Sequence, residues 1–273
     1  MSEASSGTVT ETIYLETREL ILAGTYAPGD VITPTALRNL FELKSVYAPR
    51  DALNALAVDG YLDVDVKLGF RVRLWTPSLL DRLFTSFANL QHVALTRAME
   101  RASDEVLASF VQDTETHARS AGSGDGALEA YHLFHGSIIR MSRIPRFAEM
   151  SSRVVAPAFH RRAWIVASEV PNLLRKWSWD VVARAMLERD VQRSAELLKR
   201  QIMLPRSAAL AWAARVALKP LSSKPAELRR LGRPASSRPD LAFVLGATPW
   251  GITPRDRPSL VPSPPTSAAA SQP

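Results

Sequence analysis

The chain has 273 residues, of which 46% are hydrophobic and 22% charged, and this suits two compact domains with buried cores. It contains no cysteine, so disulfides, thiolate zinc sites and iron–sulfur clusters are excluded. No apolar run approaches the ~20 residues that a membrane span needs, and the first residues lack the basic start and apolar core of a secretory signal. We therefore expect a cytoplasmic protein with no redox role and no membrane partner.

The net charge of +7 points towards a nucleic-acid partner, but it is unevenly distributed. Residues 1–75 carry 7 Lys and Arg against 10 Asp and Glu, residues 76–218 carry 19 against 14, and residues 219–273 carry 8 against 3. The N-terminal segment is thus slightly acidic. Bulk charge does not support DNA binding there, so only the local placement of cations can.

Three short helices and a β-hairpin are predicted within residues 9–75. Thr8 and Glu11 have the spacing of a capping box at the start of the first helix. Thr33-Pro34 starts the second helix, and Asp59-Gly60 ends the third. Two segments that alternate apolar and polar residues follow, at 61–66 and 70–75. Three helices followed by a two-stranded wing are the pattern of a winged helix-turn-helix.

From Pro77 onward the pattern is helical, with no convincing strand. We expect a fold that is mostly α, in which residues 76–218 form an all-α bundle of about six helices. Residues 219–273 are rich in Pro, Ser, Ala and Arg, and we expect a largely disordered tail there and a flexible N-terminus over 1–8. The candidate helices of the bundle are 77–102, 103–119, 126–142, 145–168, 171–189 and 190–218.

The segment from Leu15 to Asp30 contains the pattern "I-x-x-G-x-x-x-P-G". It resembles the helix and turn that open the DNA-binding domain of GntR-family transcriptional regulators. Arg50-Asp51-Ala52-Leu53, followed by Leu56 and Asp59-Gly60-Tyr61-Leu62, resembles its recognition helix and exit, and Gly69-Phe70-Arg71-Val72 resembles the end of its wing. The helical remainder is similar to the FCD ligand-binding domain of the FadR subfamily, on Phe134-His135, Ile138-Ile139, Met141-Ser142, Ala185, Arg189-Asp190 and Ala195.

The resemblance implies a homodimer that reads a palindromic operator in double-stranded DNA. Arg50 stands at the family's arginine position, where a guanidinium grips guanine or phosphate, and Arg38 resembles a phosphate-binding arginine. Independently, Arg50 and Asn54 lie four residues apart and so share a helix face, opposite Leu53 and Leu56. The candidate DNA contacts are Arg38, Lys44, Ser45, Tyr47, Arg50, Asn54, Lys67 and Gly69.

The start of the recognition helix departs from the family pattern. Val46 follows Ser45 where the family has arginine, and Pro49 stands where it has valine. If Ser45 were the N-cap, Pro49 would lose the first intrahelical hydrogen bond. We therefore expect the helix to start a residue or two later, and the sequence preference to differ from that of relatives.

Many FCD domains hold a metal with one aspartate and three histidines. At the matching positions this chain has Tyr131, His135, Trp179 and Gln201, so only His135 is a good ligand. We predict no tightly held metal and no cofactor. His132, on the same predicted helix, is not expected to restore the site, and the other histidines are dispersed along the sequence.

Two interpretations of these positions stay open. In one, Tyr131, His135, Trp179 and Gln201 line a pocket for a small organic effector, and Arg140 is close enough in sequence to help bind an acid. In the other, the aromatic side chains fill the volume that relatives give to the metal, and the domain is closed.

The leading hypothesis is an effector-responsive repressor that acts as a dimer. The alternative is a ligand-independent or degenerate GntR-like protein that acts through protein–protein contacts. An enzyme is not predicted, because the sequence has no glycine-rich phosphate loop and no nucleophile elbow.

Overall fold

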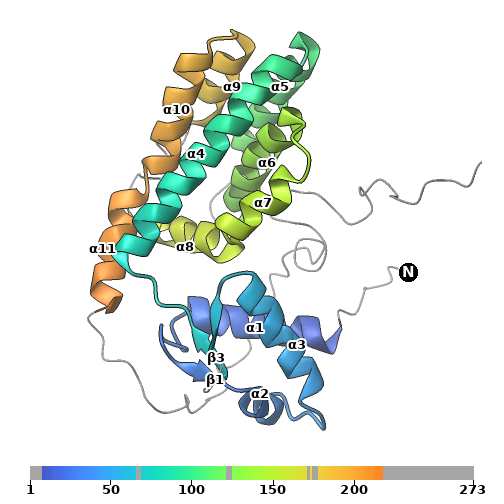
Figure 1. Ribbon diagram of the computed structural model, residues 1–273, viewed down its shortest axis with the longest axis vertical. Helices are drawn as coiled ribbons and strands as arrows, with labels where there is room; N and C mark the ends of the chain where they lie inside the picture. Colours follow the sequence, from blue (N-terminus) through green and yellow to red (C-terminus); the bar gives the residue numbers. More distant parts are fainter. Residues whose placement is uncertain (1–7, 66–68, 121–124, 171–172, 174–177, 218–273) are drawn as a thin grey trace, which may run out of the picture.

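The computed structural model describes residues 8–65, 69–120, 125–170, 173 and 178–217 (Figure 1). The predicted flexible N-terminus (except Thr8), Lys67 and the predicted disordered tail lie outside the described residues. An N-terminal unit, residues 8–75, sits at one end of a taller helical unit, residues 77–217 (Figure 1). The elements of the N-terminal unit are α1 (Val9–Leu22), β1 (Val31–Ile32), α2 (Pro34–Leu40), α3 (Tyr47–Val58), β2 (Leu62–Asp65) and β3 (Gly69–Val72).

Local sequence signals explain where the first two helices start. Glu11 N–H donates to the Thr8 hydroxyl at 3.2 Å, and Thr8 N–H donates to the Glu11 carboxylate at 3.1 Å, so the predicted capping box is present. The Thr33 hydroxyl accepts from Ala36 N–H at 3.1 Å, and Pro34 takes the first position of α2. Both helix starts are therefore encoded within a few residues.

The wing is a three-stranded antiparallel sheet in the order β1-β3-β2. β2 and β3 form the predicted hairpin, with Leu62 opposite Val72 and Asp65 opposite Gly69. The short strand β1 adds to the other side of β3, with Val31 opposite Arg71. Leu62, Phe70 and Val72 turn one face of this sheet towards the helices and are buried.

The helical unit is built around one long helix, α4 (Pro77–Arg101), which packs against α6, α10 and α11. In the described part of the chain it has more helices than the six predicted, because two predicted helices are each divided. Pro157 and Pro205 cause the divisions: each lacks an N–H donor, and Ala156 before Pro157 is extended. The remaining elements are α5 (Asp104–Ser120), α6 (Asp125–Ser142), α7 (Phe147–Val154), α8 (Pro157–Ser168), α9 (Trp179–Leu187), α10 (Val191–Met203) and α11 (Arg206–Ala217).

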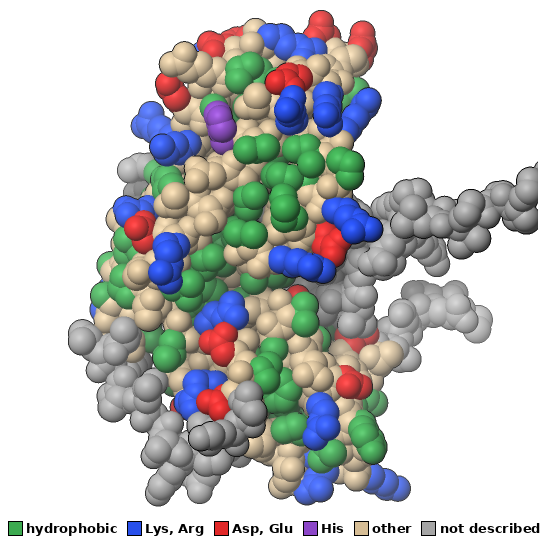
Figure 2. Space-filling view, in the orientation of Figure 1, with side chains coloured by type: hydrophobic (Ala, Val, Ile, Leu, Met, Phe, Trp, Pro, Cys, Tyr) green, Lys and Arg blue, Asp and Glu red, His purple; other side chains and the backbone are tan. Residues whose placement is uncertain are grey.

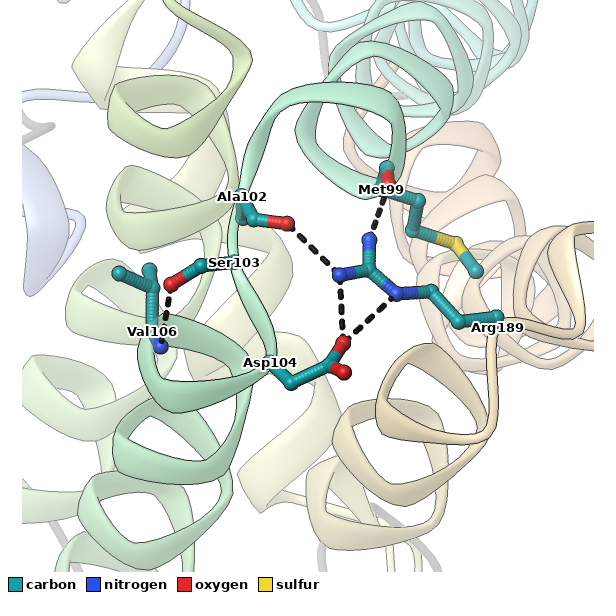
Figure 3. A network of polar contacts seen from close by, with 6 residues as sticks. All are labelled: Met99, Ala102, Ser103, Asp104, Val106 and Arg189. Atoms are coloured by element: carbon teal, nitrogen blue, oxygen red, sulfur yellow. Dashed lines mark hydrogen bonds and ion pairs between the residues drawn. The ribbon is translucent and has the colours of Figure 1, made fainter.

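The Arg189-Asp190 pair, one of the blocks that carried the FCD resemblance, has a structural role. Arg189 adopts a positive φ of 60° in the turn between α9 and α10. Its guanidinium donates to the carbonyl oxygens of Met99 and Ala102 and to the carboxylate of Asp104, at 2.7 Å for the last two (Figure 3). This network ties the α9–α10 turn to the end of α4. Asp190 caps α10 by accepting from Arg193 N–H at 2.9 Å.

Among the described helices, none combines the length and apolar character that crossing a bilayer requires.

Candidate nucleic-acid interface and buried aromatic cluster

Helix α3 begins at Tyr47, after the irregular segment that the sequence flagged. Ser45 Oγ accepts from Tyr47 N–H at 3.2 Å, and Val46 stands at the N-cap position without a capping side chain. Pro49 is therefore the third helical residue, and its missing N–H falls among the donors that have no intrahelical partner in any case. The expectation that the helix starts after Ser45 is confirmed, and Pro49 adds a buried apolar ring to its first turn.

The faces of α3 are sharply divided. Ala52, Leu53 and Leu56 are fully buried against the rest of the N-terminal unit. The opposite face carries four residues spaced four, three and four positions apart, so they form one stripe along the helix. Tyr47 and Val58 at its ends are 75% and 81% exposed. We name this surface the reading stripe; it consists of Tyr47, Asp51, Asn54 and Val58.

Arg50 is exposed and lies at one edge of the reading stripe, about 60° from its centre. The four-residue spacing predicts that Arg50 and Asn54 share a face, and the two residues are adjacent on α3 in the structure. Asp51 was missed as a candidate, although its spacing from Tyr47 was a usable signal. The stripe therefore contains a carboxylate, Asp51, and Arg50 borders it.

The side chains of Arg50, Asp51 and Asn54 have no hydrogen-bond or ion-pair partner within the part of the chain that the structure describes. Other arginines of the same unit are engaged. Arg71 donates to the Gly29 carbonyl at 2.6 Å, and Arg73 pairs with Asp63 at 2.7 Å. The polar groups around the reading stripe are thus available to an external partner, whereas neighbouring charges hold the wing together.

The other candidate contacts are spread around α3. Lys44 and Ser45 are exposed just before it. Arg38 on α2 is half-buried, and its guanidinium donates to the Asn39 side chain at 2.9 Å. Gly69 begins β3 with a φ of 93°, and a Cβ there would meet no atom within 4 Å. In Figure 2 the visible face of the N-terminal unit shows charges of both signs, in keeping with its near-neutral composition.

In the helical unit, three of the candidate effector residues meet in one buried aromatic cluster. The ring of His135 lies 4.6 Å from that of Tyr131 and 4.9 Å from that of Trp179, centroid to centroid. Gln201 is close by, since its side-chain oxygen accepts from Ser178 N–H at 3.2 Å. Tyr131, His135 and Trp179 are thus brought together, and Gln201 contacts the backbone next to Trp179.

Arg140 lies elsewhere. It is exposed on α6 and donates to Ser137 Oγ at 2.7 Å. Together with Asp113 and His117 of α5 it lines an open groove of about 110 Å³, of which Trp179 forms part of the wall. An acid held by Arg140 would therefore sit in this groove and not in the aromatic cluster.

His160 of α8 is a member of the cluster that the sequence analysis did not place. Its Nδ1 lies 2.8 Å from the phenol oxygen of Tyr131. The expectation that the other histidines are dispersed does not hold for His160, and the ring of His132 also lies 5.8 Å from that of His160. No spacing rule could show this, since α8 reaches the cluster only through the tertiary fold.

Burial keeps these three imidazoles neutral. It lowers the pKa of His132 to about 3, and it lowers the pKa values of His135 and His160 well below the usual histidine range. Neither ring nitrogen of His135 has a hydrogen-bond partner among the described residues, and the residue is fully buried. The cluster is therefore an apolar environment with a few polar atoms enclosed in it.

Little space is left inside the cluster. The cavity beside Tyr131 and His160, closed by Phe87 and Trp164, has a volume of about 10 Å³, enough for roughly one water molecule. Within the described residues no three His, Asp or Glu side chains are arranged to hold a metal ion. Tyrosine, tryptophan and a neutral amide at three of the four positions do not fit the metal of FCD relatives.

Comparison with known proteins agrees with this architecture. Residues 83–203 match the FCD domain family. YdhC of Bacillus subtilis (strain 168), an uncharacterized HTH-type transcriptional regulator, is 26% identical over 132 residues, which cover 47% of this chain and 58% of YdhC. The match thus spans less than two thirds of that relative.

Solved structures with under 20% identity share the fold. Lar, which controls the expression of the agr system of Listeria monocytogenes, is 15% identical with a TM-score of 0.56 over 76% of this chain and 99% of Lar. McbR/YncC of E. coli is 18% identical with a TM-score of 0.51 over 77% and 99% of the two chains. A protein from Rhodococcus sp. RHA1 described as a GntR transcriptional regulator is 15% identical, with a TM-score of 0.50 over 76% and 97%.

The chain thus joins a winged helix to a helical domain, and residues 83–203 of that domain match the FCD domain family. The curated relative and the Rhodococcus structure to which the chain is similar are described as regulators of transcription.

Proposed function

We propose that the protein is a sequence-specific DNA-binding transcription regulator of the FadR subfamily, with a DNA-binding domain at 9–75 and an effector-binding and dimerisation domain at 76–218. The observation that carries the proposal is the reading stripe, an exposed helix face bordered by Arg50, whose polar side chains have no partner among the described residues. A recognition helix that enters the major groove needs such a face.

The chemistry of the reading stripe fits base edges. Asn54 can make two hydrogen bonds to adenine, and the Asp51 carboxylate can accept from the amino group of cytosine. Tyr47 and Val58 offer apolar surface to thymine methyl groups. Arg50 at the edge grips guanine or a phosphate. Phosphate and minor-groove contacts are assigned to Arg38, Lys44, Ser45, Lys67 and Gly69.

We further propose that the protein works as a homodimer on a palindromic operator in the cytoplasm, and that it represses transcription until an effector binds. A two-fold protein matches a two-fold site, and each half-site then takes one α3. The effector proposal rests on the buried polar atoms of His135, which a small neutral molecule would satisfy after the cluster opens.

The second candidate is a ligand-independent regulator controlled by protein contacts. The small cavity of about 10 Å³ favours it, because the aromatic side chains already occupy the space that a ligand would need. A screen of small organic molecules for a raised Tm, followed by isothermal titration of those that raise it, separates the two candidates. A ligand-independent regulator gives neither a raised Tm nor a heat of binding.

The DNA proposal is tested by selecting duplexes from a random pool with the purified protein, and then measuring binding by fluorescence anisotropy at several salt concentrations. A selected palindrome that binds at least about a thousandfold more tightly than scrambled duplex, with affinity that falls as salt rises, is the expected result. Selection of no sequence would refute the proposed function.

A further inference from the structure

We propose that α8 is a positioning helix, which holds the ends of α1 and α3 on one face and senses the Tyr131–His160 contact on the other. This inference rests on the proposed function, because its consequence is a change in DNA affinity. Figure 1 shows α8 at the end of the helical unit that faces the N-terminal unit.

The residues of α8 divide between two opposite faces. Phe159, His160 and Trp164 lie against the aromatic cluster and line its cavity. Ala158, Arg161 and Arg162 contact the N-terminal unit. At about 100° per residue these two sets point in opposite directions. A helix that is packed on both faces cannot shift on one side without shifting on the other.

The first turn of α8 is fitted closely to the end of α3. Ala158 N–H donates to the carbonyl oxygen of Asp59, the C-cap of α3, at 3.0 Å. Gly60 follows with a φ of +80°, and a Cβ there would lie 2.7 Å from Cβ of Ala156. The end of α3 thus lies directly against the start of α8, and the guanidinium of Arg73 lies beside this contact, with Nη1 2.8 Å from the position of a Gly60 Cβ.

The second contact is with the end of α1. That helix has no basic residue in its own last turn. Arg162 supplies the charge, since its guanidinium lies 3.5 Å from the carbonyl oxygen of Ile21, and Arg161 lies 3.6 Å from the Glu19 carboxylate. Arg162 also stacks 4.7 Å from the ring of Trp212 on α11. α8 therefore holds two helix ends of the N-terminal unit at once.

The position of α8 is set in turn by the Tyr131–His160 contact of 2.8 Å. The phenol of Tyr131 comes from α6, and the imidazole is on α8, so this contact fixes α8 to the centre of the helical unit. Any event that separates the two groups, including an effector that takes one of them as its own partner, releases the start of α8. The end of α3 then loses its support, and DNA reading weakens.

The test removes one end of this path at a time. Tyr131→Phe deletes the phenol and keeps the ring. Ala158→Pro deletes the N–H that reaches Asp59, at the second position of α8, where no intrahelical bond is lost. The matched control is Thr114→Val, which removes a buried hydroxyl from α5, where it donates to the Phe110 carbonyl at 2.7 Å.

Hydrogen exchange of the free full-length protein gives the first readout. Tyr131→Phe is expected to speed the exchange of the Asp59, Gly60 and Tyr61 amides, which close α3, while Thr114→Val leaves them unchanged. Unchanged exchange at these amides in Tyr131→Phe would overturn the proposal. This arm needs no DNA, so it stands even if the proposed function fails.

Affinity for a duplex selected by the wild-type protein gives the second readout. Tyr131→Phe and Ala158→Pro are each expected to weaken binding about fivefold or more. The double variant is expected to bind no less tightly than the single variant with the lower affinity, because both substitutions break the same path. Additive losses, or wild-type affinity in Tyr131→Phe, would contradict coupling through α8. Failure of the wild-type protein to select any duplex refutes the proposed function instead.

Discussion

The phenol oxygen of Tyr14 lies 2.5 Å from Oδ2 of Asp59, and this contact joins α1 to the residue that ends α3. Both groups are largely buried, and burial raises the pKa of each. Tyr14 thus supplies a donor to a carboxylate that water reaches poorly. The orientation of α3 depends on this pair as well as on its apolar face.

Removal of the Tyr14 hydroxyl is expected to destabilise the protein. Tyr14→Phe leaves the Asp59 carboxylate without this donor, at a cost of about 1–3 kcal/mol in the free energy of unfolding. Urea denaturation measures the loss. Tyr26→Phe is the matched control, because the Tyr26 hydroxyl is buried with no hydrogen-bond partner among the described residues. Equal losses in the two variants would show that the Tyr14–Asp59 contact contributes nothing specific.

The buried histidines make stability dependent on pH. Because burial lowers the folded-state pKa of His132, His135 and His160, only the unfolded chain takes up protons below pH ~6.5. Above that pH these three histidines leave the free energy of unfolding unchanged. Below it the free energy of unfolding falls as the pH drops towards about 3, the pKa of His132. Each group contributes a slope of up to about 1.4 kcal/mol per pH unit.

His135→Leu isolates this effect at one position. It removes two unpartnered buried nitrogens and one titrating group, so stability at pH 7.5 is expected to stay equal or to rise. Urea midpoints between pH 7.5 and 4.5 are expected to fall less steeply than in the wild-type protein. A large loss at pH 7.5 would indicate that His135 holds a ligand, a water or a metal that stabilises the fold.

Gly60 is expected to tolerate no side chain. Gly60→Ala places a Cβ at a φ of +80°, 2.7 Å from Cβ of Ala156 and 2.8 Å from Nη1 of Arg73, so both strain and overlap apply. We expect a loss of about 2–4 kcal/mol, from roughly 1 for the left-handed backbone and 1–3 for overpacking. Gly24→Ala shares the positive φ but meets no atom within 4 Å, and it isolates the backbone share in the same denaturation experiment. If both variants lose the same amount, α8 does not press on Gly60.

Asp51 is expected to set specificity at the expense of affinity. Asp51→Asn removes a negative charge from a surface that faces phosphates, so binding to scrambled duplex should tighten. Discrimination between the selected palindrome and single-base changes should fall by about 1–3 kcal/mol at one position only. Competition anisotropy with a panel of substituted duplexes measures both. An equal gain on every duplex would assign Asp51 a purely electrostatic role.

Sequence patterns located the elements whose signals are local. The capping box at Thr8, the helix start at Pro34 and the β-hairpin each depend on residues close together in the chain, and all are present. The split at Pro157 was missed because the apolar pattern on either side continues in phase. The spacing of apolar residues favours one long helix there, but a residue that precedes proline is disfavoured in the α-helical conformation.

The candidate sites were predictable only in part. The proximity of Tyr131, His135 and Trp179 could be predicted because the FCD resemblance aligned these positions with one site. The place of His160 and the approach of Ala156 to Gly60 could not, because both depend on contacts between distant segments. Arg140 shows the opposite case: it is close to His135 in sequence, yet its side chain faces the groove on the outside of α6. Proximity along a helix does not fix the face on which a side chain lies.

The central claim, that the reading stripe recognises DNA, is tested most directly by the affinity of Asn54→Ala for the selected palindrome and for scrambled duplex, measured by anisotropy at one salt concentration. The account predicts a loss of about tenfold to a hundredfold on the palindrome and almost none on scrambled duplex, because a base contact is lost and no charge changes. Equal affinities of Asn54→Ala and the wild-type protein for the palindrome would contradict it.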